Sequence, residues 1–186
     1  MDGFEGEKGS INSFALVSYL SGPLAAFLDR LRCELVPKCR AKAHVTVLPP
    51  RPIHGPSDQA WEQVRNNLHD FEPFRVELGS VEVFPMTQVI YLSLLAGRRE
   101  LERIHSALNV DAVRYEEPFT YHPHITLAQE LTPAEHASAL ELCEREWRKF
   151  SHSRTFSVDK LTFVQNTLDD RWIDLAGHAL TSRVTL

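Results

Sequence analysis

The sequence contains little cysteine and no long hydrophobic run. Its three cysteines, Cys33, Cys39 and Cys143, are odd in number and form no CxxC pair. This usage favours reduced thiols and predicts a cytoplasmic protein. No apolar stretch approaches the roughly 18 residues that span a bilayer, so we expect no membrane partner. The N-terminal residues MDGFEGEKGS lack the apolar centre of a signal peptide, and we expect residues 1–11 to form a flexible tail.

Positive charge is also in short supply. The 186 residues include 20 lysines and arginines against 25 aspartates and glutamates, which gives a formal net charge of −5. Proteins that coat long nucleic acids by charge are usually strongly basic. The composition therefore argues against extended duplex nucleic acid as a partner, although it leaves room for a pocket that binds one phosphate. The length suits a single domain, which we expect to be a monomer.

Several catalytic signatures are missing as well. The sequence has no GxSxG nucleophile motif and no GxxxxGK[ST] phosphate loop. It also lacks a matched carboxylate pair of the kind that glycoside hydrolases use. Histidine, with nine residues, remains as the side chain suited to acid–base chemistry near neutral pH.

What the sequence does contain is an order of elements that occurs twice. Each half reads as a strand, a helix, a strand with a His-x-Thr motif, a second helix and a strand. In the first half these elements span about 14–20, 23–35, 41–50, 57–71 and 74–83. In the second half they span about 89–96, 98–108, 121–130, 132–150 and 156–164, and a further strand is expected over 171–175.

The helices support this repeat because their apolar residues have the same spacing in both halves. The apolar stripe of the second helix in each half consists of Trp61, Val64, Leu68 and Phe71, and of Leu140, Cys143, Trp147 and Phe150. Ser57 is the expected N-cap of the earlier helix. Thr132-Pro133-Ala134-Glu135 predicts a capping box at the start of the later one.

We therefore predict an α+β fold that carries an internal duplication. The expected architecture is one bilobal domain over residues 1–186, with two small, mainly antiparallel sheets and helices on the outside. The lobes would span 12–84 and 88–176. A pseudo-twofold axis between the lobes would place the two His-x-Thr strands on either side of a central cleft.

The two His-x-Thr motifs point to one kind of chemistry. Residues i and i+2 of a strand lie on the same face, so His44 projects with Thr46 and His124 with Thr126. Two imidazoles can act together as a base and an acid, and two hydroxyls can donate hydrogen bonds to phosphate oxygens. The set favours metal-free displacement at phosphorus. One histidine would deprotonate the attacking water and the other would protonate the leaving oxygen.

The motifs HVTVLPP and HITLAQ resemble those of the 2H phosphoesterase superfamily, which includes 2′-5′ RNA ligases and RNA 2′,3′-cyclic phosphodiesterases. The resemblance covers most of residues 12–176. It implies catalysis by His44 and His124, phosphate binding by Thr46 and Thr126, and no metal or other cofactor. The implied substrate is a nucleotide or an RNA end. Gln129 is a departure, because RNA-ligase-like members often have a basic residue there.

Four other residues are candidate substrate contacts. Arg51 follows the first motif strand and could reach the phosphate, although a solvated loop residue is the simpler interpretation. Tyr91 could stack on a base at the edge of the cleft or could pack in the core. Arg114 and Tyr115 lie in the stretch VRYEEPFTY before the second motif, which could form a loop that gates the cleft.

The sequence leaves two other functions open. The cleft could bind a nucleotide or an RNA end without turnover. Alternatively, His44, His122 and His124 could hold a metal for a metal-dependent hydrolase. The motifs also do not separate a hydrolase from a ligase, a 2′-phosphate product from a 3′-phosphate product, or the acidic histidine from the basic one.

Overall fold

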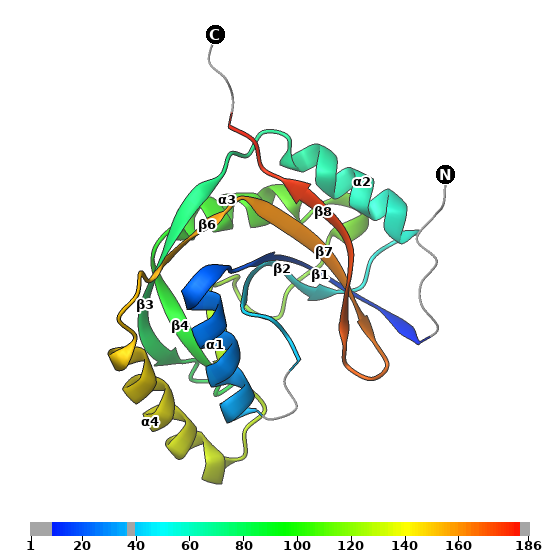
Figure 1. Cartoon of the computed structure of the whole chain (residues 1–186). Coiled ribbons are helices and arrows are strands. Elements are labelled where there is room, and N and C mark those ends of the chain that lie inside the picture. The colour runs from blue at the N-terminus through cyan, green and yellow to red at the C-terminus, as the bar shows by residue number, and fades with distance from the viewer. Residues whose placement is uncertain (1–8, 37–39, 183–186) are drawn as a thin grey trace.

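Two four-stranded antiparallel sheets form the framework of the protein (Figure 1). The computed structural model describes residues 9–36 and 40–182. The first sheet has the order β2-β1-β7-β8, with β1 (Ser10–Tyr19), β2 (His44–Arg51), β7 (Lys160–Thr167) and β8 (Trp172–Ala179). The second has the order β5-β4-β3-β6, with β3 (Phe74–Val83), β4 (Ile90–Ala96), β5 (Ile125–Ala128) and β6 (Thr155–Val158). The predicted α+β class is confirmed.

The internal duplication is visible in the order of the strands. Each His-x-Thr motif belongs to an edge strand, β2 or β5, and the neighbour of that strand is the opening strand of the same half, β1 or β4. The halves exchange their closing strands, however. β3 joins the second sheet, while β7 and β8 join the first. The division of the chain at 12–84 and 88–176 therefore does not coincide with the division into sheets.

Several boundaries differ from those predicted. The second motif strand, expected over 121–130, is only β5 (Ile125–Ala128), and the helix expected over 57–71 ends at Leu68. The expected strand over 156–164 is divided at Asp159 into β6 and β7, which belong to different sheets. The apolar alternation slips by one residue at Asp159 and Lys160, which are both exposed, but such a slip does not show that the two strands join different sheets. Ser10 and Ile11, which were expected to belong to the tail over 1–11, belong to β1. Residues 1–8 and Cys39 lie outside the described residues.

The helices form where the apolar spacing predicts them. They are α1 (Gly22–Leu35), α2 (Ser57–Leu68), α3 (Arg98–Leu108) and α4 (Pro133–Lys149), with a short 3-10 turn η1 (Asp111–Val113). The capping box of α4 is confirmed, since the backbone N–H of Thr132 donates to Glu135 Oε2 at 2.9 Å. The N-cap of α2 is Pro56 rather than Ser57. None of the described helices is long and apolar enough to cross a membrane.

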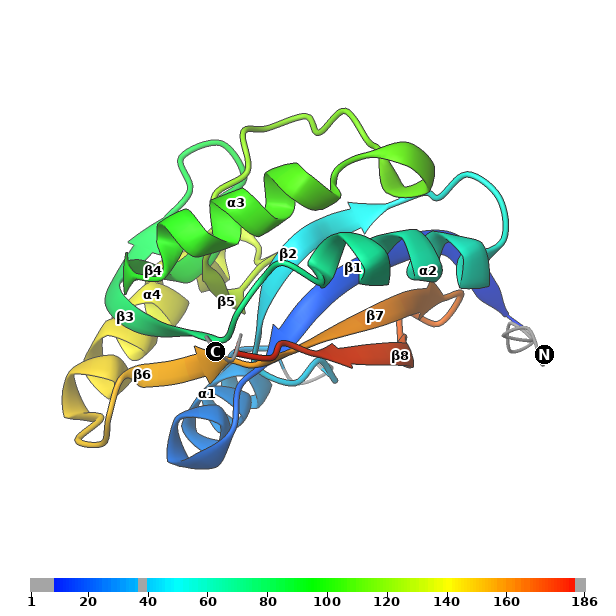
Figure 2. The ribbon, with the colours of Figure 1, turned by 90° about the horizontal axis from the view of Figure 1, so that it is seen from above.

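The helices cover the sheets in two pairs (Figure 2). α2 and α3 pack against one another beside the first sheet, where Trp61 stacks on Phe163 of β7 at 5.8 Å. α1 and α4 pack together beside the second sheet, where Phe27 meets Phe150 at 4.6 Å. One continuous buried cluster joins these layers. The motif strands β2 and β5 lie close to each other within this frame.

Candidate active site

The first motif lies on β2, with its two polar side chains turned away from the core. Val45 and Val47 are completely buried, whereas His44 and Thr46 are partly exposed. The pairing of β2 with β1 places Tyr19 opposite His44. The alternation of the strand therefore presents an imidazole and a hydroxyl together, as the His-x-Thr spacing predicts.

The second motif repeats this arrangement at the start of β5. His124 comes immediately before the strand, and Ile125 and Leu127 are buried while His124 and Thr126 are partly exposed. Thr126 lies opposite Tyr91 of β4 in the register of the second sheet. Both motif strands are thus edge strands whose apolar residues anchor them in the same core.

The two imidazoles are fixed in the same way. His44 Nδ1 lies 2.7 Å from the carbonyl of Lys42, and His124 Nδ1 lies 2.6 Å from the carbonyl of His122. A carbonyl can only accept, so each Nδ1 is assigned the proton and donates it. In the neutral ring, this assignment makes Nε2 the nitrogen that accepts a proton and later returns it.

The protonation of both imidazoles is perturbed. The pKa of His44 is lowered from 6.5 to about 4, mainly by burial and further by the charges of Arg32 and His124. Burial also lowers the pKa of His124, with an added contribution from His122. The two motifs are therefore within electrostatic reach of each other. An anionic phosphate between the rings would raise both pKa values, because opposite charge favours the protonated form.

His124 also contacts an aromatic pair. Phe84, in the turn between β3 and β4, stacks on Tyr91 with ring centroids 4.0 Å apart. The ring of His124 meets both edge-on, at 5.0 Å from Phe84 and 5.3 Å from Tyr91. The Tyr91 hydroxyl donates to Glu82 Oε2 at 3.0 Å. Tyr91 is only 4% exposed, whereas Phe84 is half-buried, so Phe84 is the more accessible of the two rings.

Arg51 lies in a buried polar network at the end of β2. It is 2% exposed, and its Nε donates to the carbonyl of Pro49 at 2.9 Å. Its Nη1 donates to Asn109 Oδ1 at 2.8 Å and to the carbonyl of Val113 at 3.2 Å, and its Nη2 pairs with Glu117. This arrangement gives the guanidinium a structural role that the sequence did not indicate.

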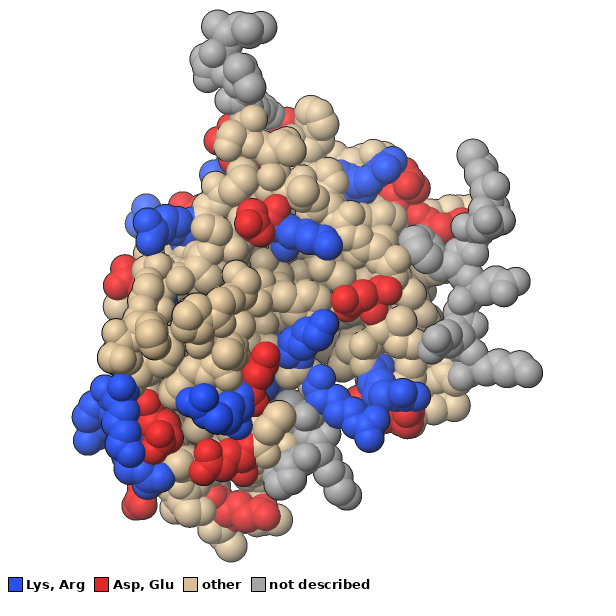
Figure 3. All heavy atoms as spheres, viewed as in Figure 1, with Lys and Arg blue, Asp and Glu red and all other residues tan. Residues whose placement is uncertain are grey.

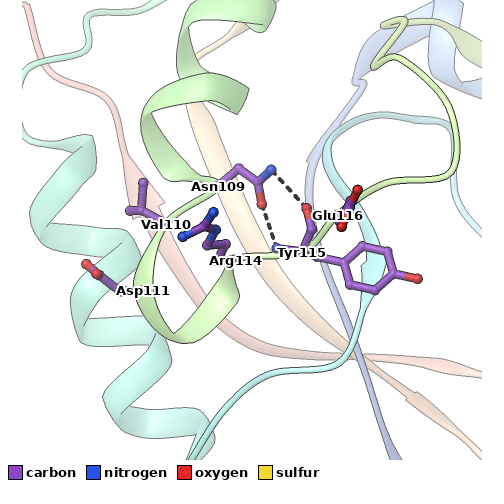
Figure 4. A pocket seen from close by; sticks show the side chains of 6 residues that line it. All are labelled: Asn109, Val110, Asp111, Arg114, Tyr115 and Glu116. Carbon is purple, nitrogen blue, oxygen red and sulfur yellow. Dashed lines mark hydrogen bonds between the residues drawn. The ribbon is translucent and has the colours of Figure 1, made fainter.

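Arg114 and Tyr115 line a separate pocket of about 540 Å³ (Figure 4). Its other lining residues are Asn109, Val110, Asp111 and Glu116. The side chain of Asn109 closes the loop, because it accepts from the backbone N–H of Tyr115 at 2.9 Å and donates to the carbonyl of that residue at 3.1 Å. At about 3.3 Å per residue, the Arg51 end of β2 is roughly 20 Å from His44. Since Arg51 bonds to Val113, this pocket lies toward the far end of the strand from the motif.

A metal centre finds little support in the geometry. Within the part of the chain that the structure describes, no three histidine, cysteine, aspartate or glutamate side chains are grouped so that they could hold a metal ion. The set of His44, His122 and His124 is therefore not arranged as a metal site. The site instead offers two fixed imidazoles and two hydroxyls.

The lowered pKa of His44 predicts a loss of stability in acid. Between pH 6.5 and about 4 the unfolded chain binds a proton at this residue that the folded chain does not. The contribution of His44 to the free energy of unfolding is therefore fully present above pH 6.5, and it is lost as the pH falls through this range. Between pH 7 and pH 4, we expect the free energy of unfolding to fall by about 3 kcal/mol less in the His44→Gln variant than in the wild type, as measured by urea unfolding.

The matched control for this measurement is His69→Gln. The His69 side chain is 88% exposed, so this variant makes the same substitution outside the two motifs. Identical pH profiles for His44→Gln and the wild type would contradict the prediction.

The chain matches known proteins over most of its length. Residues 20–170 match the model of the 2′-5′ RNA ligase superfamily. A Bacillus cytotoxicus protein described as a candidate phosphoesterase is 28% identical over 142 residues, which cover 72% of this chain and 80% of that protein. Among solved structures, Escherichia coli LigT in complex with 3′-AMP aligns with a TM-score of 0.64 and 16% identity, over 92% of this chain and 99% of LigT.

Two further sets of structures agree with this fold. A Thermus thermophilus protein aligns with a TM-score of 0.61 and 18% identity, over 90% of this chain and 97% of the other. LigT has also been solved with ATP, NADP+ and phosphate. The match to the family model over residues 20–170 covers both motifs and the strands that hold them. The chain therefore belongs to the 2′-5′ RNA ligase superfamily.

Proposed function

We propose that the protein is a metal-independent phosphoesterase that opens 2′,3′-cyclic phosphates on nucleotides or RNA ends, or acts on 2′-5′ linkages. The observation that carries this proposal is the matched geometry of the two motifs. Both imidazoles are fixed through Nδ1 to the carbonyl two residues earlier. His44 begins edge strand β2, His124 directly precedes edge strand β5, and these two strands contact each other. Membership of the superfamily and the complex of LigT with 3′-AMP support the same class of substrate.

The proposed reaction uses His44 and His124 as an acid–base pair. The phosphate lies between the motifs, where the hydroxyls of Thr46 and Thr126 donate to its non-bridging oxygens. Nε2 of one histidine takes a proton from water while the water oxygen bonds to phosphorus. The bond from phosphorus to the ribose oxygen breaks, and the protonated Nε2 of the other histidine donates its proton to that oxygen. Proton exchange with solvent then restores both rings.

Phe84 gives the site a surface suited to a nucleobase. Its ring is half-buried, is backed by Tyr91 and lies beside His124. A base stacked on an aromatic ring typically contributes about 1–3 kcal/mol to binding. In this arrangement Tyr91 supports Phe84 from below rather than contacting the base itself.

The surface charge favours small substrates. The face in Figure 3 carries acidic and basic side chains interspersed around a broad uncharged area. Together with the net charge of −5, this distribution gives little electrostatic attraction for long RNA. We therefore favour cyclic nucleotides and short RNA ends as substrates.

A substrate panel tests this function. It contains the four 2′,3′-cyclic nucleotides, 3′,5′-cyclic AMP, a 2′-5′-linked dinucleotide and glycerol 1,2-cyclic phosphate, each incubated in EDTA and followed by phosphorus NMR. We expect turnover of the 2′,3′-cyclic nucleotides or the 2′-5′ linkage, and weaker turnover of the glycerol compound. Binding of nucleotides without any product would instead identify a binding protein.

The variants Phe84→Ala and Met86→Ala extend this test to the nucleobase. Met86 lies in the same turn as Phe84 and is 80% exposed, so it is the matched control. We expect Phe84→Ala to raise KM for cyclic nucleotides about tenfold, in line with the loss of one stacking contact, and Met86→Ala to leave KM unchanged. Equal KM values for the two variants would argue against base stacking on Phe84.

A further inference from the structure

A tyrosine connects the two motifs directly. The hydroxyl of Tyr121 donates to the backbone carbonyl of Thr46 at 2.7 Å. Thr46 is the threonine of the first motif, and Tyr121 lies three residues before the histidine of the second. Edge strands such as β2 have backbone groups on one side that no neighbouring strand pairs. Tyr121 supplies a donor to a backbone carbonyl of this edge strand.

The segment that carries His124 depends on contacts of this kind. Residues 114–124 contain no helix or strand, so regular backbone pairing does not set their position. The carbonyl of His122, the next residue after Tyr121, accepts from Nδ1 of His124. The hydrogen bond from Tyr121 to Thr46 therefore helps to place the His122 carbonyl, which orients the imidazole of His124.

The ring of Tyr121 is itself fixed by neighbouring side chains. Its ring stacks on His105 of α3, with centroids 4.0 Å apart and planes only 3° from parallel. His105 Nε2 lies 2.8 Å from Glu117 Oε1, and Glu117 pairs with Arg51 at the end of β2. The side chains of His105 and Glu117 are 12% and 11% exposed, so the network is largely shielded from water. The ring whose hydroxyl reaches Thr46 is thus fixed by α3, through His105, and by β2, through Arg51 and Glu117.

We propose that Tyr121 is a positioning residue, which holds the second motif against the first through its hydrogen bond to the Thr46 carbonyl. This inference rests on the proposed function for its effect on catalysis. The tether sets the placement of His124 relative to the phosphate-binding Thr46. Acid–base catalysis requires both groups to reach one phosphate at the same time, and a misplacement of about 1 Å can cost about 100-fold in rate.

The Tyr121→Phe variant removes the hydroxyl but keeps the ring that stacks on His105. We expect kcat to fall about 10- to 100-fold and KM to change less than about threefold. Trp147→Phe is the matched control, because the Trp147 Nε1 also donates to a carbonyl of another element, that of Gly79, at 2.8 Å. This control loses the same type of bond outside the motifs and should retain kcat, even if its melting temperature falls.

A second measurement tests the positioning role of Tyr121 without an activity assay. The ring resonances of His44 and His124 are titrated by NMR in the wild type, Tyr121→Phe and Trp147→Phe. A loosened segment admits water, so we expect the pKa of at least one of these histidines to rise in Tyr121→Phe and neither to change in Trp147→Phe.

The two readouts separate failure of the tether from failure of the proposed function. Unchanged histidine titrations in Tyr121→Phe would overturn the positioning role, and so would an unchanged kcat in an active enzyme. A wild type that is inactive on the whole panel, together with altered titrations in Tyr121→Phe, would support the tether and reject the proposed function.

Discussion

Replacement of either His44 or His124 by alanine is expected to lower kcat by about 10²- to 10⁴-fold, the usual contribution of a general acid or base. Each ring is fixed through Nδ1, so that Nε2 is the nitrogen that moves a proton. Alanine removes that nitrogen, and the histidine of the other motif, whose ring is fixed by a hydrogen bond to the carbonyl two residues earlier, cannot replace it. Initial rates on a 2′,3′-cyclic nucleotide measure the loss.

The threonine variants provide the comparison for the histidine result. Thr46→Val and Thr126→Val keep the shape of the side chain but remove a hydrogen-bond donor to the phosphate. We expect each to cost less than either histidine variant, because acid–base transfer is retained. Wild-type kcat in His44→Ala or His124→Ala would contradict the acid–base assignment. The urea unfolding curve of each variant shows whether a loss of activity reflects a loss of fold.

The second large effect is on stability. Arg51→Met is expected to lower the free energy of unfolding by about 3–5 kcal/mol, the usual cost of removing one partner of a buried ion pair. The substitution leaves Glu117 and Asn109, both of which bond to the guanidinium, without that partner. Urea unfolding at pH 7 measures the change.

The double variant Arg51→Met/Glu117→Gln is the control for this prediction. It removes the carboxylate charge that Arg51→Met leaves without its guanidinium partner, so it should recover part of the lost stability. A contact between Arg51 and substrate predicts the opposite pattern, in which Arg51→Met raises KM and leaves the unfolding curve unchanged. That result would contradict the structural role of Arg51.

The predictable part of the fold comes from short-range patterns. The alternation around His44 and His124 is periodic over a few residues, so the inward and outward faces of both motif strands follow from the sequence. The helix stripes, such as Leu101, Ile104 and Leu108, are completely buried as their spacing indicates. The capping box at Thr132 is equally local.

What could not be predicted depends on partners far apart in the chain. The exchange of β3 and β7 between the sheets leaves no mark on their local alternation. Arg51 looks like a loop residue because its partners, Asn109 and Glu117, lie 58 and 66 residues later. Tyr121 likewise reaches Thr46 across 75 residues. These contacts are set by how the two halves pack together, which periodicity within one half cannot show.

The central claim is that two histidines open a cyclic phosphate without a metal. Phosphorus NMR of a 2′,3′-cyclic nucleotide in EDTA, with wild type and the His44→Ala/His124→Ala double variant at equal concentration, tests it most directly. We predict that the cyclic resonance is replaced by that of a monoester with the wild type and persists with the double variant. Equal rates for the two proteins, or activity that EDTA abolishes and added metal restores, would contradict the account.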